Sequence, residues 1–243
     1  VFVGFNPKLE DFTGLDDIKA INGNFTVVEN DELVSFIGFN GDDDGDNDDD
    51  GLSAINGNLF VGLYFDRFGK GIAGGNDSLV DLDGLQSLIT VTGNMVLAFN
   101  GAMEDLNGLS NFTTLNGDLT FLGQNMDSLH GAPNLAVIGK DLNFGQLLRV
   151  DGKPFDPNEV DDTLKLTDVF DKTTAISTEV KLDLSAGQNG FDALTTVNGN
   201  VIVAFSDLNE LQFTDPDGDG GDIPGTDLAT IGKSLILYGN SAP

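Results

Sequence analysis

A short phrase that recurs along the chain constrains its fold more than any other feature. The phrase is an aliphatic residue, two small or polar residues, an Asn or Asp, and then an alternating apolar segment. About eight copies are present, and they begin at Ile21, Ile55, Val91, Leu115, Ile138, Ile176, Val197 and Ile231. The most regular copies lie about 23 residues apart. A repeat of this length indicates stacked units, none of which buries its apolar face alone.

The apolar residues change period on either side of this phrase. Before the phrase they recur at every third position, as in Leu79, Leu82, Leu85, Leu88 and Val91. After it they alternate, as in Met95, Leu97 and Phe99, which is typical of a half-buried strand. We expect the Gly-Asn step to supply a left-handed corner, and the Asn of successive corners to form a hydrogen-bonded ladder. The sequence therefore predicts an all-β solenoid, a parallel β-helix of about eight short coils.

The units at 79–99 and 103–121 approach the pattern L-x-x-L-x-G-L-x-x-L-x-x-I-x-G-N-L. This pattern resembles the receptor L-domain, a short right-handed β-helix related in appearance to leucine-rich repeats. The resemblance covers most of residues 10–240 and implies a right-handed parallel β-helix. We expect a single such domain over residues 1–243. Animal receptor L-domains usually carry cysteines and this chain has none, so the resemblance points to bacterial surface proteins with similar repeats.

Composition narrows the classes of partner. The chain has 11 basic and 40 acidic residues and a net charge of -29, so we expect no nucleic-acid partner, because phosphate binding needs Lys and Arg. The absence of cysteine excludes disulfides and thiolate metal sites. No apolar run is long enough to insert into a membrane. The chain begins at Val1 without a signal peptide, and we interpret it as the mature form of a secreted or cell-surface protein.

Four insertions interrupt the repeats, near 30–50, 65–80, 147–169 and 207–226. Each follows an alternating strand, so we expect all four loops to emerge at one edge of the solenoid. Loops gathered on a rigid scaffold are where repeat proteins often place function. Residues 69–75, rich in glycine, lack the phosphate-loop pattern and are predicted to be a flexible loop.

Two of these insertions are acidic and are candidate Ca²⁺ loops. Alternating aspartates place carboxylates on one side of a tight turn, and hard oxygen ligands suit Ca²⁺. The candidate ligands are Asp42, Asp44, Asp46, Asp48 and Asp50 in the first loop, and Asp215, Asp217, Asp219, Asp222 and Asp227 in the second. The run from 215 to 220 is similar to the opening of EF-hand and dockerin calcium loops, without a glutamate at the twelfth position. The alternative is that both loops are solvated and only increase solubility.

An apolar outward face is the candidate surface for binding or assembly. Residues that alternate with the core positions are predicted to point outward, and they include Val28, Phe60, Tyr64, Val96, Leu122, Ile202, Ile236 and Tyr238. Three interpretations compete: the insertions cover this face, it contacts another protein or a second copy of the chain, or it binds a carbohydrate, a peptide or an ordered surface such as ice.

Catalysis is not favoured. His130 is the single histidine, and Arg67 and Arg149, the only two arginines, lie in different insertions. No nucleophile motif accompanies His130. The sequence favours a non-catalytic extracellular recognition or adhesion module, stabilised by Ca²⁺, whose ligand is a protein or carbohydrate surface. The alternatives are a self-associating subunit of a surface layer, sheath or filament, and a carbohydrate-active β-helix enzyme.

Overall fold

The structure is a computed structural model, and it describes residues 1–41, 51–65, 71–122, 131–144, 182–183, 193–204, 211–212 and 228–238. Within these ranges every regular element is a β-strand and there is no helix. The strands of the two large sheets pair in parallel. The prediction of an all-β fold with parallel strands is therefore confirmed.

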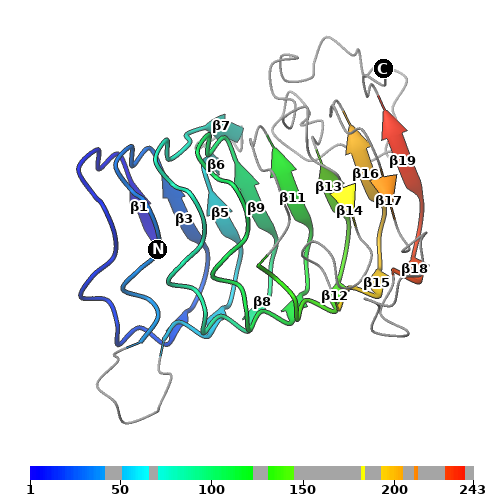
Figure 1. Ribbon diagram of the computed structural model, residues 1–243, viewed down its shortest axis with the longest axis horizontal. Helices are drawn as coiled ribbons and strands as arrows, with labels where there is room; N and C mark the ends of the chain where they lie inside the picture. Colours follow the sequence, from blue (N-terminus) through cyan, green and yellow to red (C-terminus); the bar gives the residue numbers. More distant parts are fainter. Residues whose placement is uncertain are drawn as a thin grey trace, which may run out of the picture.

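The larger sheet has eight strands, which follow one another in the order of the chain (Figure 1). They are β1 (Phe2–Gly4), β3 (Phe25–Val28), β5 (Leu59–Val61), β9 (Met95–Ala98), β11 (Leu119–Leu122), β13 (Leu142–Phe144), β16 (Val201–Ala204) and β19 (Leu235–Tyr238). These are the alternating segments that follow the phrase, together with one strand at the start of the chain.

The second sheet has seven strands of two residues each, in the same spatial order. They are β2 (Ala20–Ile21), β4 (Ala54–Ile55), β8 (Thr90–Val91), β10 (Thr114–Leu115), β12 (Val137–Ile138), β15 (Thr196–Val197) and β18 (Thr230–Ile231). Each of these strands ends on the first aliphatic residue of a phrase. Each repeat therefore supplies one strand to each sheet, and the repeats lie side by side along the long axis (Figure 1).

The number of strands in the larger sheet matches the expected number of repeats, but the members differ. Strand β1 extends the sheet beyond the first phrase by pairing with β3, and the phrase pattern gave no sign of it. Conversely, β13 pairs directly with β16, so the predicted repeat that begins at Ile176 adds no strand between them. Residues 176–180 themselves lie outside the described residues.

The core lies between the two sheets and the segments that connect them. The third-position series before the phrase is fully buried: Leu79, Leu82, Leu85, Leu88 and Val91 each have 0% exposure. The inward residues of the long strands, such as Leu97 and Phe121, join the same cluster. Burial of the aliphatic residues in both periods is therefore as predicted for the inner repeats, whereas Leu235 and Leu237 of the last strand, which were predicted to face inward, are 44% and 57% exposed.

The phrase glycines act differently from the prediction. Among those described, only Gly23 has a positive φ, at 130°. A Cβ at Gly57 would collide with the backbone of Gly23, and a Cβ at Gly117 would collide with the backbone of Gly93 and the side chain of Asn94. The corner requires glycine because neighbouring repeats approach closely there, and a left-handed backbone is not the general reason.

The described part of the second insertion includes two paired strands, which we call the hairpin. Strands β6 (Leu63–Phe65) and β7 (Gly71–Ala73) pair in antiparallel fashion. Gly74 continues the connection, donating to Gly62 O (2.9 Å) and accepting from Glu29 N (3.0 Å). The prediction of a flexible loop over residues 69–75 is wrong for 71–75, which are held by these backbone bonds.

The insertions do not all leave the same corner of the repeat. The hairpin follows β5, at the end of a long strand. Residues 42–50 are inserted later, in the segment that precedes β4, and their neck is closed by the bond from Leu52 N to Phe39 O (2.8 Å). The expectation of a single edge therefore fails for these two insertions. A further strand pair, β14 (Leu182–Asp183) with β17 (Leu211–Gln212), lies outside the two large sheets.

Candidate functional site

Most of the predicted outward face is buried. Val28 is 0% exposed, Leu122 is 1% and Ile202 is 4%, while Phe60 and Val96 are each 9%. These five side chains are therefore not an exposed binding surface, although they do point away from the main core. Of the other predicted members, Tyr64 and Ile236 are half-buried, and Tyr238 is described only as part of strand β19.

The hairpin covers one part of this face. Leu63 is 1% exposed and packs with Phe60, Val96, Ala98 and Leu122 in a second apolar cluster, separate from the main core. The alternating pattern placed Leu63 in the main core, but the chain leaves the sheet at Gly62, where φ is 84°. After that turn the side chain of Leu63 lies on the outer side of the sheet.

An aromatic cluster lies beside the hairpin. Tyr64 meets Phe2 and Phe5 edge-on, with ring centroids 6.3 and 5.8 Å apart. Phe65 meets Phe60 at 5.4 Å. Phe2 is 55% exposed, Phe5 58% and Phe65 39%, so this cluster is an exposed apolar patch. Of the predicted face it contains Phe60 and Tyr64, and the other three rings were not predicted.

The outward side of the seven-stranded sheet is a second candidate surface, which the sequence analysis did not identify. Its first row is formed by Ala20, Ala54, Thr90, Thr114, Val137, Thr196 and Thr230, which are partners in register. Its second row, two residues further along, is Asn22, Asn56, Thr92, Asn116, Gly139, Asn198 and Gly232, joined by backbone bonds such as Asn56 N to Ile21 O (2.8 Å). We call these two rows the threonine–asparagine face.

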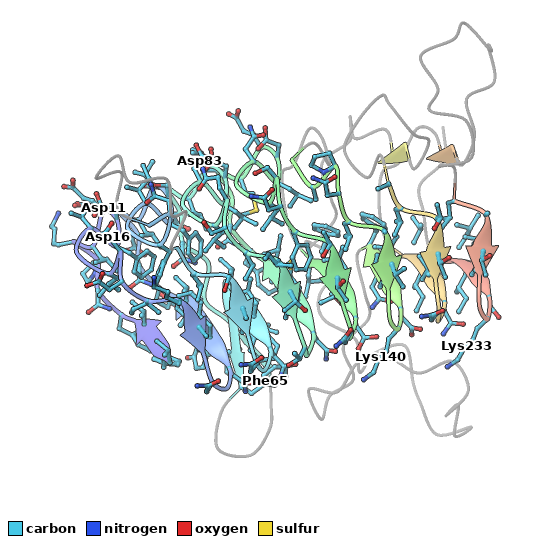
Figure 2. All side chains as sticks on the ribbon, turned by 90° about the horizontal axis from the view of Figure 1, so that it is seen from below. Asp11, Asp16, Phe65, Asp83, Lys140 and Lys233 are labelled. Atoms are coloured by element: carbon cyan, nitrogen blue, oxygen red, sulfur yellow. The ribbon has the colours of Figure 1, made fainter. Side chains whose placement is uncertain are left out.

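The threonine–asparagine face is accessible and uncharged. Thr114, Thr230, Asn116 and Asn198 are exposed, and neither row contains an ionisable residue. The charged groups lie around it: Lys140 and Lys233 extend from turns on one side of the molecule, whereas Asp11, Asp16 and Asp83 lie on the opposite side (Figure 2). In a chain of net charge -29, these two rows form an uncharged strip across seven strands. In the sequence, this face is marked by an uncharged residue on each side of the aliphatic residue that begins each phrase.

The predicted ladder is present at the corner between the two sheets. It passes from Asn24 through Asn58, Asn94, Asp118 and Asp141 to Asn200. Each side-chain oxygen accepts from the backbone N–H of the next member, at 2.7–3.0 Å. The ladder satisfies the backbone donors at this corner and fixes the step between repeats.

A second asparagine ladder lies where the long strands end, and it was not predicted. Asn30, Asn76 and Asn100 are each 0% exposed. The Nδ2 group of Asn76 donates to Asn100 Oδ1 (3.0 Å) and to Val27 O (3.2 Å), and Asn76 Oδ1 accepts from Asn30 Nδ2 (3.1 Å). The available signal was an Asn five residues after the first residue of β3 and of β9.

The predicted Ca²⁺ ligands lie outside the described residues, both those at 42–50 and those at 215–227. Elsewhere, in the part of the chain that the structure describes, no group of three or more acidic or His side chains is placed to hold a metal ion. Acidic residues still influence one another on the connecting segments. Burial raises the pKa of Asp81, and the neighbouring charges of Asp83, Asp105 and Glu104 raise it further against the opposing backbone bond from Asp83.

A scan of protein-family models finds no family that matches the chain, and searches of curated proteins and of solved structures return no match. Over the residues described, there is no helix with the length and apolar character that crossing a membrane requires.

Proposed function

We propose that this protein is a secreted or cell-surface recognition and adhesion module, non-catalytic, built as a right-handed parallel β-solenoid with bound Ca²⁺. Its ligand is a protein or carbohydrate surface, and the threonine–asparagine face makes the contact. The solenoid is supported by two parallel sheets of the same strand order, with one strand of each per repeat and the core between them.

The observation that carries the binding role is the charge-free threonine–asparagine face. Its threonine hydroxyls and asparagine amides offer both donors and acceptors on strands about 4.8 Å apart. The alanine, valine and glycine members of the two rows contribute neither. Because no carboxylate interrupts the rows, a neutral partner approaches them without displacing counterions or pairing buried charge. The ladders hold the strands that carry these groups, so little ordering cost accompanies binding.

Ca²⁺ supports the same role from the acidic loops. The aspartates at 42–50 follow each other closely, and unneutralised they repel one another. The described residues on either side of this segment are joined by the bond from Leu52 N to Phe39 O (2.8 Å). A divalent cation there would stiffen the rim of the solenoid without taking part in a reaction.

The test compares binding of the intact chain with that of face variants. The double variant Thr114→Lys, Thr196→Lys introduces two positive charges in the first row, and Thr13→Lys places one positive charge on an exposed connecting segment as a control. Glycan arrays and immobilised surface proteins are the targets. We expect the double variant to lose about tenfold or more in affinity, since unpaired charge opposes a neutral partner, while T13K binds as the unaltered chain does.

Two further measurements separate the alternatives. Size-exclusion chromatography with electron microscopy detects self-association, and discrete monomers would count against a filament or layer subunit. Product analysis on any glycan that binds detects hydrolysis or elimination, which would replace the adhesion role with catalysis. Equal binding by the double variant and by T13K would remove the threonine–asparagine face from the proposal.

A further inference from the structure

Three aromatic side chains near the start of the chain form a corner with two walls beside β1. The rings of Phe2 and Phe5 lie roughly parallel, with an interplanar angle of 26° and centroids 6.3 Å apart. Tyr64, which comes from the hairpin, stands almost perpendicular to both, at 87° and 82°. Since Phe2 and Phe5 are 55% and 58% exposed, ring surfaces of two orientations are accessible to a partner.

A carboxylate lies against the same corner. Glu29 follows β3 as Phe5 follows β1, and Phe5 N donates to Val28 O (3.1 Å), so Phe5 and Glu29 are neighbours across the sheet. Glu29 Oε1 and Tyr64 Cδ1 each lie 3.3 Å from the point that a Cβ on Gly74 would occupy. The carboxylate and the tyrosine ring therefore border one space, within reach of a single bound group.

This carboxylate has no partner in the part of the chain that the structure describes. The one ion pair there joins Lys8 to Glu32, and no hydrogen bond reaches either carboxylate oxygen of Glu29. The face of an aromatic ring carries negative electrostatic potential, so an unpaired carboxylate beside such rings favours a cation. The net charge of -29 attracts a cationic partner from a distance.

We infer that the corner formed by Phe2, Phe5, Tyr64 and Glu29 binds an arginine side chain of a basic partner protein. A guanidinium is planar and weakly hydrated, so it stacks on a ring while its N–H groups pair with a carboxylate. A lysine ammonium is a strongly hydrated point charge and gains less at an open aromatic surface. The corner lies apart from the threonine–asparagine face, so this site goes beyond the proposed function and does not depend on it.

The experiment titrates the full chain with three short peptides that differ at one residue, which is arginine, lysine or citrulline. Citrulline keeps the shape of the arginine side chain without its charge. Binding is followed by NMR at constant ionic strength. We expect the arginine peptide to shift the ring signals of Phe2, Phe5 and Tyr64 in a saturable way, the lysine peptide to bind about threefold more weakly, and the citrulline peptide about tenfold more weakly.

Two pairs of variants connect the binding to these groups. Glu29→Gln is expected to weaken arginine binding about threefold, whereas Glu104→Gln removes the same charge from an exposed residue elsewhere and should have no effect. Phe5→Leu removes an exposed ring and should also weaken binding about threefold. Phe65→Leu removes an exposed ring outside the corner and is its control.

The inference is overturned if the arginine peptide leaves the three rings unshifted, or if the citrulline or lysine peptide binds as tightly as the arginine peptide. These comparisons use the unaltered chain and do not depend on the folding of any variant. Equal weakening by E29Q and E104Q would likewise overturn it, because the effect would then belong to the acidic surface as a whole.

Discussion

At the scale of single residues, the glycines of the phrase set how closely neighbouring repeats approach. Gly117 lies against Gly93 and Asn94, so a methyl group there must push two repeats apart. We predict that Gly117→Ala lowers the free energy of unfolding by about 2 kcal/mol, as overpacking does in a core. Chemical denaturation measures the change.

Gly101 is the matched control for that substitution, because a Cβ built there meets no atom within 4 Å and its φ is not positive. Gly101→Ala is expected to change stability by less than about 0.5 kcal/mol. Equal effects of G117A and G101A would mean that the close approach at Gly117 is not what requires glycine.

The contrast between the aliphatic residues and these glycines shows what the residue pattern determines. The positions of Leu85 and Leu97 in two different periods were enough to predict their burial, because period alone defines which side faces the core. The role of Gly57 was predicted wrongly, because residue type does not reveal the gap between repeats. A position can require glycine for a left-handed φ or for a close approach of neighbouring backbones, and the sequence shows glycine in both cases.

At the scale of the elements, the ladder at the ends of the long strands is a fully buried polar connection between repeats. Asn76 exchanges hydrogen bonds with Asn30 and Asn100 and also donates to Val27 O. We predict that Asn76→Ala lowers the free energy of unfolding by about 3 kcal/mol or more, because several buried groups lose a partner together. Thermal and urea unfolding report the loss.

Asn134 provides the comparison for Asn76, since its amide is exposed and donates to a single carbonyl, Ser110 O (2.6 Å). Asn134→Ala should cost less than about 1 kcal/mol. Should N76A unfold no more easily than N134A, the ladder would be a consequence of the stacking and not one of its causes.

The hairpin is the element that covers part of the predicted outward face. Leu63 packs against Phe60 and Val96. We therefore predict that Leu63→Ala lowers the free energy of unfolding by about 2–3 kcal/mol, because it leaves a cavity. Val34 is exposed and provides the comparison. We expect V34A to change the free energy of unfolding by less than about 0.5 kcal/mol. Similar values for L63A and V34A would show that the hairpin does not cover the sheet in solution.

Sequence periodicity could not have placed this hairpin. The alternation of Leu59, Val61 and Leu63 continues through the point where the chain turns away at Gly62. A side chain that follows the inward pattern thus packs on the outward side. The threonine–asparagine face was missed for a different reason: its residues flank the first aliphatic residue of each phrase and carry no apolar period of their own.

At the scale of the whole molecule, the net charge of -29 makes bound cations an expected part of the folded state. If the loops at 42–50 and 215–227 bind Ca²⁺ only when folded, calcium stabilises the protein by mass action, about 2.7 kcal/mol at a hundredfold excess over the dissociation constant. We predict that EDTA lowers the melting temperature and that added Ca²⁺ restores it. Differential scanning calorimetry at constant ionic strength measures both.

The experiment must separate specific Ca²⁺ binding from general charge screening, because any divalent cation screens a strongly acidic surface. Mg²⁺ at the same concentration is the control, since it screens equally but fits a flexible all-protein oxygen site poorly. The variants D44N with D46N, and D217N with D219N, should each remove part of the Ca²⁺ response and leave the Mg²⁺ response unchanged. A melting temperature that rises equally with both cations would assign the effect to screening alone, and one that EDTA leaves unchanged would remove calcium from the folded state.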